Sequence, residues 1–246
     1  MSSNSNAISQ EHVLLKKLNK VILQKGELHM NGNGPAKIAD RVYVGGKSSA
    51  KDVRSLLSLG ITHVLNCSPG LVQTGRVFYE KKGLRLLEYR EVDAKDSKGS
   101  PILDMHLNVA SSLLKRVDQT DEGKLFIHCY AGCNRSVCLA AASLVVTRKD
   151  GLINVMRRIV KVRPQVLSNR SFREQLVKLA ILLGLEENTK EMIMEKKESL
   201  TEGEEIRSRR STEGRSSDSK PETFNFIDTN SQTSKMSLPG KKSSCK

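Results

Sequence analysis

The feature that most constrains the fold is the stretch at residues 125–146, in which two apolar runs flank a short polar loop. The first run, Leu125, Phe126 and Ile127, is typical of a buried strand. The second run, residues 137–146, is long enough for a buried helix, and Gly132 interrupts the loop between them. The sequence therefore predicts a strand, a tight loop and a helix in direct succession.

Two side chains of this loop, Cys129 and Arg135, indicate nucleophilic chemistry on an anion. The thiolate is the reactive form of a cysteine, so a catalytic Cys129 must lie where negative charge is stabilised. If the loop curls, the backbone N–H groups of residues 130–135 converge on one point, which the positive end of the helix dipole also faces. Such a site binds a dianion, with the sulfur in line with the phosphorus of a phosphate group.

The spacing of the remaining loop residues fits the same chemistry. Five residues separate Cys129 from Arg135, which allows one turn of the chain, so the guanidinium returns beside the sulfur and binds two oxygens. Gly132 suits a positive φ or a close backbone approach, and the Ser136 hydroxyl can hydrogen-bond the sulfur and stabilise it as a leaving group. The alternative, a structural cysteine on a core strand, needs neither the glycine nor the arginine. The predicted phosphate-binding residues are Tyr130, Ala131, Gly132, Cys133, Asn134 and Arg135.

The pattern His128-Cys129-x-x-Gly132-x-x-Arg135-Ser136 resembles the phosphate loop of the cysteine-dependent protein phosphatases, and its surroundings resemble their dual-specificity branch. Residues 37–46 are similar to the opening stretch of that branch. The resemblance covers roughly residues 37–184, with Ser168 standing where the family usually has a second proline. A third, independent similarity consists of Arg163, Pro164, Asn169, Phe172, Gln175 and Leu176.

The resemblance implies an α/β fold in which helices flank a central mixed, largely parallel sheet of about five strands, as in phosphotyrosine phosphatases. An N-terminal helix and a disordered C-terminal tail would complete the chain. The implied activity is hydrolysis of phosphotyrosine and of phosphoserine or phosphothreonine on proteins, without a metal or other cofactor. For His128 the resemblance implies a supporting role, in which the imidazole holds the loop by hydrogen bonding and favours the thiolate.

Cleavage of a phosphoester also needs a proton donor for the leaving oxygen, and residues 93–101 have the composition of a loop that could supply it. This loop offers two carboxylates, Asp93 and Asp96. In the related enzymes the acid comes seven residues after a tyrosine that ends a strand, and Tyr89 lies seven residues before Asp96. We therefore select Asp96 as the acid. A solvated loop carboxylate or a helix cap is the alternative for both residues.

Residue periodicity predicts the other elements. Strands are expected within residues 37–46, which hold a pair, and at 61–66, 84–92 and 124–128; helices are expected at 49–57, 102–117, 136–147, 152–162 and 172–183. Ser49 is the expected cap of the first of these helices, and Gly60 is its expected end. Residues 79–83 are expected to form a link.

Three regions follow from this pattern: an N-terminal extension at residues 1–35, a catalytic domain at 36–185 and a disordered, charged and serine-rich tail at 186–246. Residues 9–23 carry apolar side chains at helical spacing with lysines between them. Packing of this helix on the domain is the favoured interpretation, and a basic membrane-surface or partner helix is the alternative. The tail holds 12 basic and 12 acidic side chains, so the net charge of +14 lies before it and suits an anionic substrate.

The expected partners are phosphorylated proteins, with MAP kinases among the candidates. We expect no DNA and no stable membrane insertion, because no apolar run approaches the length of a membrane span; the oligomeric state is left open. Five cysteines without regular spacing, and the lack of an apolar N-terminal segment, indicate a reducing compartment. The cytoplasm is therefore expected, with the nucleus as a second candidate.

Cys67 and Cys133 are candidates to trap an oxidised Cys129 as a disulfide and protect it from further oxidation. Some relatives use a strand-end cysteine in this way. Cys67 comes one residue earlier than expected, however, and one step along a strand reverses the direction of a side chain.

Two other classes of function compete with a protein phosphatase. The first is a phosphatase of RNA 5′-triphosphates, which Asn134 before Arg135 favours, or of phosphoinositides. Lipid enzymes of this kind tend to carry lysines at the variable loop positions, where this chain has Tyr130, Ala131, Cys133 and Asn134. The second is a scaffold that binds phosphosites without turnover. Such modules have usually lost the nucleophile or the arginine, and both are present here.

Overall fold

The computed structural model describes residues 2–23 and 34–187. In chain order the elements are α1 (Ser2–Leu23), β1 (Ala36–Ala39), β2 (Val42–Gly45), α2 (Lys47–Lys51), α3 (Val53–Leu59), β3 (His63–Asn66), α4 (Arg76–Glu80), β4 (Glu88–Glu91), α5 (Ile102–Gln119), β5 (Leu125–His128), α6 (Arg135–Arg148), α7 (Leu152–Val162) and α8 (Arg170–Leu183). The predicted disordered tail lies outside the described residues from position 188 onward.

The strands form one sheet in the order β1-β2-β5-β3-β4. Only β1 and β2 run antiparallel, whereas β2 pairs with β5, β5 with β3, and β3 with β4 in parallel. The predicted α/β fold with a mixed, largely parallel sheet is therefore confirmed. The strand with the apolar run, β5, is the central one, and all four of its residues are buried.

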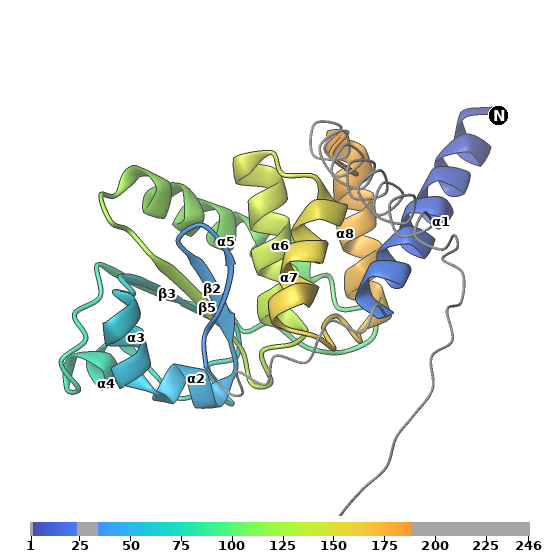
Figure 1. The fold of residues 1–246 in the computed structure, drawn as a ribbon. Coiled ribbons are helices and arrows are strands. Elements are labelled where there is room, and N and C mark those ends of the chain that lie inside the picture. The colour runs from blue at the N-terminus through green and yellow to red at the C-terminus, as the bar shows by residue number, and fades with distance from the viewer. Residues whose placement is uncertain (1, 24–33, 188–246) are drawn as a thin grey trace, which may run out of the picture. The chain divides into compact units, whose positions relative to one another are not determined.

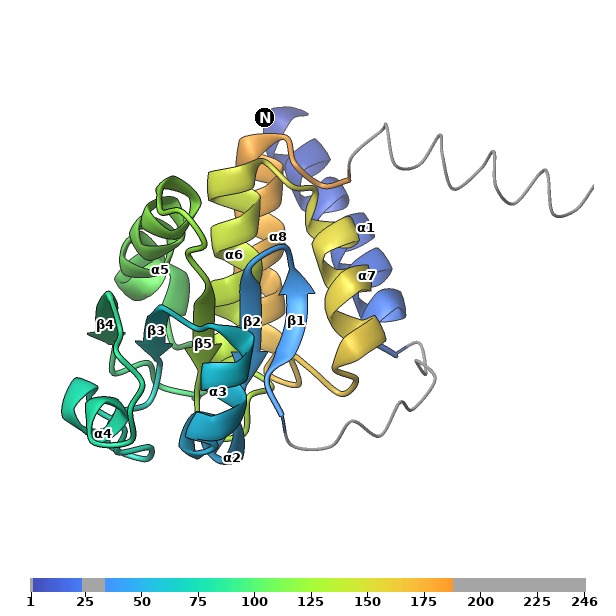
Figure 2. The ribbon, with the colours of Figure 1, turned by 60° about the vertical axis from the view of Figure 1, so that its left-hand side comes forward.

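Both faces of the sheet are covered, so the buried side chains of each strand alternate between two hydrophobic clusters. Leu65 and Ile127 point into the larger cluster, which α5, α6, α7 and α8 complete (Figures 1 and 2). Val64 and Phe126, one step earlier on each strand, point into the smaller cluster on the side of α3 and α4. This double burial explains why the strands read as continuous apolar runs.

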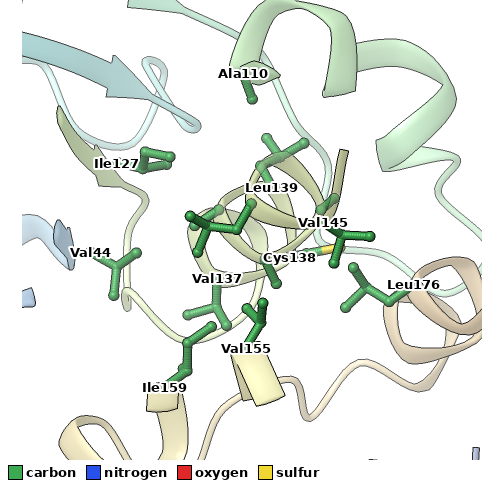
Figure 3. Close-up of a cluster of buried hydrophobic side chains, with 14 of the residues drawn as sticks. Val44, Ala110, Ile127, Val137, Cys138, Leu139, Val145, Val155, Ile159 and Leu176 are labelled. Atoms are coloured by element: carbon green, nitrogen blue, oxygen red, sulfur yellow. The ribbon is translucent and has the colours of Figure 1, made fainter. Parts of the chain in front are cut away.

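Helix α6 follows the loop and lies at the centre of the larger cluster. Figure 3 shows its side chains Val137, Leu139 and Val145 surrounded by residues of the sheet, α5, α7 and α8. Eleven residues of α6, from Arg135 to Val145, are buried in succession. A helix that is apolar on every side needs neighbours on every side, so the start of α6 is fixed by the packing of the whole domain.

Helix α1 packs against α7 and α8, as both views of the ribbon show. Leu14, Leu18 and Val21 lie in the larger cluster with at most 5% of their surface exposed. The structure thus agrees with the packed-helix interpretation rather than with a free amphipathic helix. No described helix is both long and apolar enough to span a membrane.

Four local predictions were wrong in detail: the single helix at 49–57, its Ser49 cap, the link at 79–83 and the extent of the strand at 84–92. Residues 49–57 are split between α2 and α3, since the Asp52 carboxylate accepts a bond from Ser55 N at 3.1 Å and caps α3, while Ser49 is buried in α2. Gly60 ends α3 at φ 69°, as predicted. Residues 79–80 belong to α4, which the buried Tyr79 anchors. The strand predicted at 84–92 pairs only at Glu88–Glu91, on the sheet edge.

Replacing Leu18 with alanine should lower the free energy of unfolding by about 2–4 kcal/mol, because the substitution leaves a cavity between α1 and the domain. Val13→Ala is the matched control on the same helix, since Val13 is 63% exposed; its effect should stay within about 0.5 kcal/mol. Urea denaturation of both variants measures the difference. Equal, small effects would mean that α1 does not pack on the domain in solution.

Candidate active site

The candidate nucleophile lies where the central strand ends. Strand β5 stops at His128, and its parallel neighbours β2 and β3 end beside it, at Gly45 and Asn66. In an open parallel sheet, ligands bind at this carboxyl edge. Cys129 is therefore the first residue beyond the sheet, and α6 begins six positions later at Arg135.

The Cys129 sulfur is surrounded by hydrogen-bond donors rather than by apolar groups alone. The N–H group of Gly132 donates to Sγ at 3.2 Å, and the Ser136 hydroxyl lies 3.3 Å from the same atom. Cys138, further along α6, is buried in the larger hydrophobic cluster, and burial raises the pKa of its thiol. Although Cys129 is only 1% exposed, its sulfur has the polar contacts of a nucleophile and not those of a core cysteine.

The orientation of the loop follows from its four successive carbonyl groups, all of which are bonded to groups outside the loop. Lys47 N donates to Tyr130 O at 2.8 Å, and Leu167 N donates to Cys133 O at 3.0 Å. The Arg163 guanidinium donates from Nη2 to Ala131 O at 3.1 Å and from Nε to Gly132 O at 2.6 Å. Because the C=O and N–H groups of a trans peptide point in opposite directions, the N–H groups of residues 131–134 face inward.

The role of Arg163 was not foreseen from the sequence. The residue belongs to the segment that resembles the family, and this resemblance was the one signal in the sequence, but it does not show which atoms the guanidinium reaches. In the structure Arg163 lies at the end of α7, where its backbone N–H bonds to Ile159 O.

Gly132 meets both requirements that the sequence suggested. Its φ is +72°, in the left-handed region that favours glycine. A Cβ atom at this position would lie 2.4 Å from the carbonyl carbon of Gly45 and 2.5 Å from the nitrogen of Gly46. The loop can therefore approach the end of β2 only if position 132 has no side chain.

Arg135 is buried at the start of α6. Its Nη1 donates to Ala94 O at 3.4 Å, whereas Nε has no hydrogen-bond partner among the described residues and lies 3.9 Å from an oxygen of Asp96. An oxyanion bound in the loop would give this buried donor a hydrogen bond. The structure thus brings Cys129, Gly132 N and Ser136 into contact, with Arg135 at the start of the same helix.

Asp96, rather than Asp93, is bonded to the loop. One oxygen of the Asp96 carboxylate lies 3.2 Å from Asn134 Nδ2 and 3.9 Å from Arg135 Nε, and the other accepts from Asn169 Nδ2 at 3.1 Å. Asp93 is exposed and pairs with Lys95 at 2.6 Å. That hydrogen bond lowers the pKa of Asp93. The geometry therefore supports the choice of Asp96 as a candidate acid.

His128 is fully buried and neutral. Its ring stacks on Phe126, with centroids 5.3 Å apart, and its Nε2 lies 3.5 Å from Thr74 Oγ1. Burial lowers the pKa of His128 from 6.5 to about 3. The ring is therefore held by its packing on Phe126 and by Thr74, and among the described residues Nδ1 has no hydrogen-bond partner. With so low a pKa it supplies no positive charge to the neighbouring thiol at neutral pH.

Cys67 lies beside Cys129 and not on the opposite face of the sheet. The register pairs Asn66 with His128, Cys67 N donates to His128 O at 2.8 Å, and both cysteines belong to the larger cluster. The expectation that the Cys67 side chain is turned away from Cys129 was wrong. Because β3 and β5 are parallel and Asn66 pairs with His128, the next residue on each chain points to the same face of the sheet. Cys133 donates weakly to Ala131 O at 3.5 Å, and the four described cysteines are free thiols.

The neutral His128 should make the protein sensitive to acid. Its depressed pKa contributes stability that is complete above about pH 6.5 and is lost as the pH falls toward 3, since only the unfolded chain binds the proton. From pH 7 to pH 4 we expect this residue to cost about 3 kcal/mol of unfolding free energy. Urea denaturation should show that His128→Asn removes most of this loss, while His12→Asn, at an exposed position, follows the wild type. Parallel pH curves for all three proteins would contradict the assignment.

Comparison with known proteins agrees with this geometry. Residues 42–181 match the family "Dual specificity phosphatase, catalytic domain". The chain is 34% identical over 140 residues to dual specificity protein phosphatase 26 from Rattus norvegicus and from Homo sapiens; the match covers 56% of this chain and 63% of each relative.

Solved structures with the same fold include human DUSP28 and DUSP15. Human DUSP28 superposes with a TM-score of 0.54 at 20% identity, over 62% of this chain and 97% of that one. DUSP15 superposes with a TM-score of 0.52 at 23% identity, over 61% and 88% of the two chains. Since the family match spans more than half of the sequence, the chain belongs to the dual-specificity phosphatase family.

Proposed function

We propose that the chain is a protein phosphatase that hydrolyses phosphotyrosine, phosphoserine and phosphothreonine through a phosphocysteine intermediate. The observation that carries the proposal is the outward bonding of the carbonyls of residues 130–133, which turns the loop N–H groups toward the space beside Cys129. The Arg135 guanidinium, whose Nε has no hydrogen-bond partner among the described residues, adds a positive charge at the start of α6. A dianionic phosphoryl group matches this set of donors in charge and in shape.

In the first step the Cys129 thiolate attacks phosphorus, forming an S–P bond while the P–O bond to the leaving group breaks. The loop N–H groups and Arg135 hold the equatorial oxygens as charge builds on them. Protonated Asp96 gives its proton to the departing oxygen. In the second step a water molecule attacks phosphorus, the Asp96 carboxylate takes the proton of that water, and the sulfur leaves as a thiolate that the Ser136 hydroxyl stabilises.

The breadth of the proposed specificity rests on the resemblance to dual-specificity phosphatases. It implies a domain of about 150 residues without the inserted loop that deepens the pockets of strictly tyrosine-specific enzymes, and therefore a shallower pocket. Tyr130, on the rim, is half exposed, and Lys47 Nζ lies 5.6 Å from its ring centroid.

Phosphorylated MAP kinases are our proposed substrate class. The free thiols at positions 67, 129, 133 and 138 support a reducing compartment, so we propose the cytoplasm, with the nucleus as a second location.

The main alternative, an RNA 5′-triphosphatase, was based on Asn134. In the structure the amide of Asn134 is bonded to Asp96 and Ser168, so this side chain has a use within a protein phosphatase as well. We therefore retain the protein phosphatase as the proposed function.

Cys129→Ser should lower turnover by at least about 10³-fold, because the hydroxyl is a far weaker nucleophile than the thiolate. Cys245→Ser, a thiol outside the described residues, should retain wild-type activity. The wild type should act on phosphotyrosyl and phosphothreonyl peptides and leave phosphoinositides and triphosphate-ended RNA unchanged in the same assay. Preferential turnover of RNA or lipid, or activity retained by the serine variant, would overturn the proposal.

Asp96→Asn should slow the enzyme by about 10²–10⁴-fold on phenyl phosphate, whose leaving group needs a proton. The loss should be much smaller on p-nitrophenyl phosphate, because nitrophenolate leaves readily without one. Asp93→Asn, on the same loop, should stay close to the wild type on both substrates. If Asp93→Asn shows the larger loss on phenyl phosphate, the acid has been assigned to the wrong residue.

A further inference from the structure

The side chain of Asn134 is used in an unusual way. Asn134 occupies the N-cap of α6, and an asparagine there normally accepts a hydrogen bond from the first turn of the helix. Among the described residues, the Asn134 side chain makes no such bond. Its Nδ2 lies instead 3.2 Å and 3.4 Å from the two oxygens of Asp96 and 3.0 Å from Ser168 Oγ.

We propose that Asn134 is a positioning residue that holds the Asp96 carboxyl group over the phosphate loop, and that Ser168 orients its amide for this purpose. This inference rests on the proposed function, since it assumes that Asp96 is the acid. Asn134 is directly attached to the loop, because Asn134 O accepts the bond from Cys138 N at 2.8 Å that opens α6. The acid is thereby tied to the same backbone that binds the phosphate.

Ser168 holds the amide in place. Its Oγ contacts both ends of the amide group, because it accepts from Asn134 Nδ2 at 3.0 Å and donates to Asn134 Oδ1 at 3.2 Å. A proline, which the family usually has at position 168, offers no hydroxyl for this bond. The contact between Asn134 and Ser168 therefore depends on the departure from the family pattern at position 168.

The lack of a capping bond from the Asn134 side chain also affects the anion site at the start of α6. A capping side chain would occupy an N–H group of the first turn of α6, where an anion is stabilised by the free donors and the helix dipole. Because the side chain of Asn134 turns toward Asp96, these donors stay available for the phosphate. One residue thus serves both the acid and the anion site.

Asn169 holds Asp96 from the other side, but its role is not separable from folding. It donates to Asp96 Oδ1 at 3.1 Å and to Ser97 O at 3.2 Å, and its own Oδ1 accepts from Ser171 N at 3.1 Å and caps α8. Loss of Asn169 would therefore loosen a helix as well as the acid. Asn134 caps nothing with its side chain, so its replacement is the cleaner test.

Asp96 lies in a pocket of about 480 Å³ that six other residues also line: Lys98, Asn134, Ser168, Asn169, Arg170 and Ser171. The Asp96 side chain is 30% exposed, and Arg135 Nε is 3.9 Å away. Without the Asn134 amide, the carboxylate could move toward this guanidinium, where it would no longer face the leaving oxygen. The expected defect is therefore in proton delivery.

The test is a double-mutant cycle on aryl phosphates that differ in the pKa of the leaving phenol. Asn134→Ala should lower kcat about tenfold on phenyl phosphate and less than about twofold on p-nitrophenyl phosphate. In the Asp96→Asn background it should cause no further loss on either substrate. Ser168→Ala should show the same pattern with a smaller loss, and the exposed Asn108→Ala should match the wild type.

An equal loss on all leaving groups, or a loss that adds to that of Asp96→Asn, would overturn the inference and make Asn134 a structural part of the loop. Thermal denaturation of each variant identifies a folding defect, and Asn134→Ser, which keeps a good N-cap residue, then replaces the alanine variant in the same cycle. Failure of the proposed function gives a different result, because Asp96→Asn alone would then show no dependence on the leaving group.

Discussion

The site depends on the hydrogen bonds that hold four consecutive carbonyl groups of the loop away from Cys129. Each peptide plane has a fixed geometry, so anchoring Tyr130 O through Cys133 O from outside turns the following N–H groups inward. The anchors come from distant parts of the chain: the start of α2, the end of α7 and the connection between α7 and α8. A phosphate site is thus assembled by groups that never contact the phosphate.

The fold places these anchors because the loop follows the central strand and precedes the central helix. Strand β5 is paired on both sides, and α6 is enclosed by the sheet and by helices on its other sides. The neutral His128 below the loop adds to this rigidity without adding charge, since burial holds its pKa near 3. The positive charge of the site therefore comes from Arg135 and from the start of α6.

Much of this arrangement could be predicted from the sequence, because it is encoded locally. The order strand, loop and helix and the positive φ of Gly132 follow from residue type and spacing over short stretches. The choice of Asp96 rested instead on the resemblance to related enzymes, in which the acid follows a tyrosine at the spacing of Tyr89 and Asp96. What could not be predicted depends on contacts between segments far apart. Arg163 reaches the loop from 31 residues away, and the direction of Cys67 follows from the parallel register with β5 rather than from its own strand. The cap of α3 is a different case, because the Asp52 carboxylate accepts a bond from Ser55 N only three residues away, whereas we predicted Ser49 as the cap.

The most direct test of the central claim is a crystal structure of the protein treated with orthovanadate, which mimics the transferring phosphoryl group. We expect a vanadium atom bonded to Cys129 Sγ, with equatorial oxygens that accept bonds from the N–H groups of residues 131–134 and from Arg135 Nε, while the four outward carbonyl bonds remain. Vanadate bound elsewhere, or loop N–H groups that point away from it, would contradict the inward orientation of the loop N–H groups.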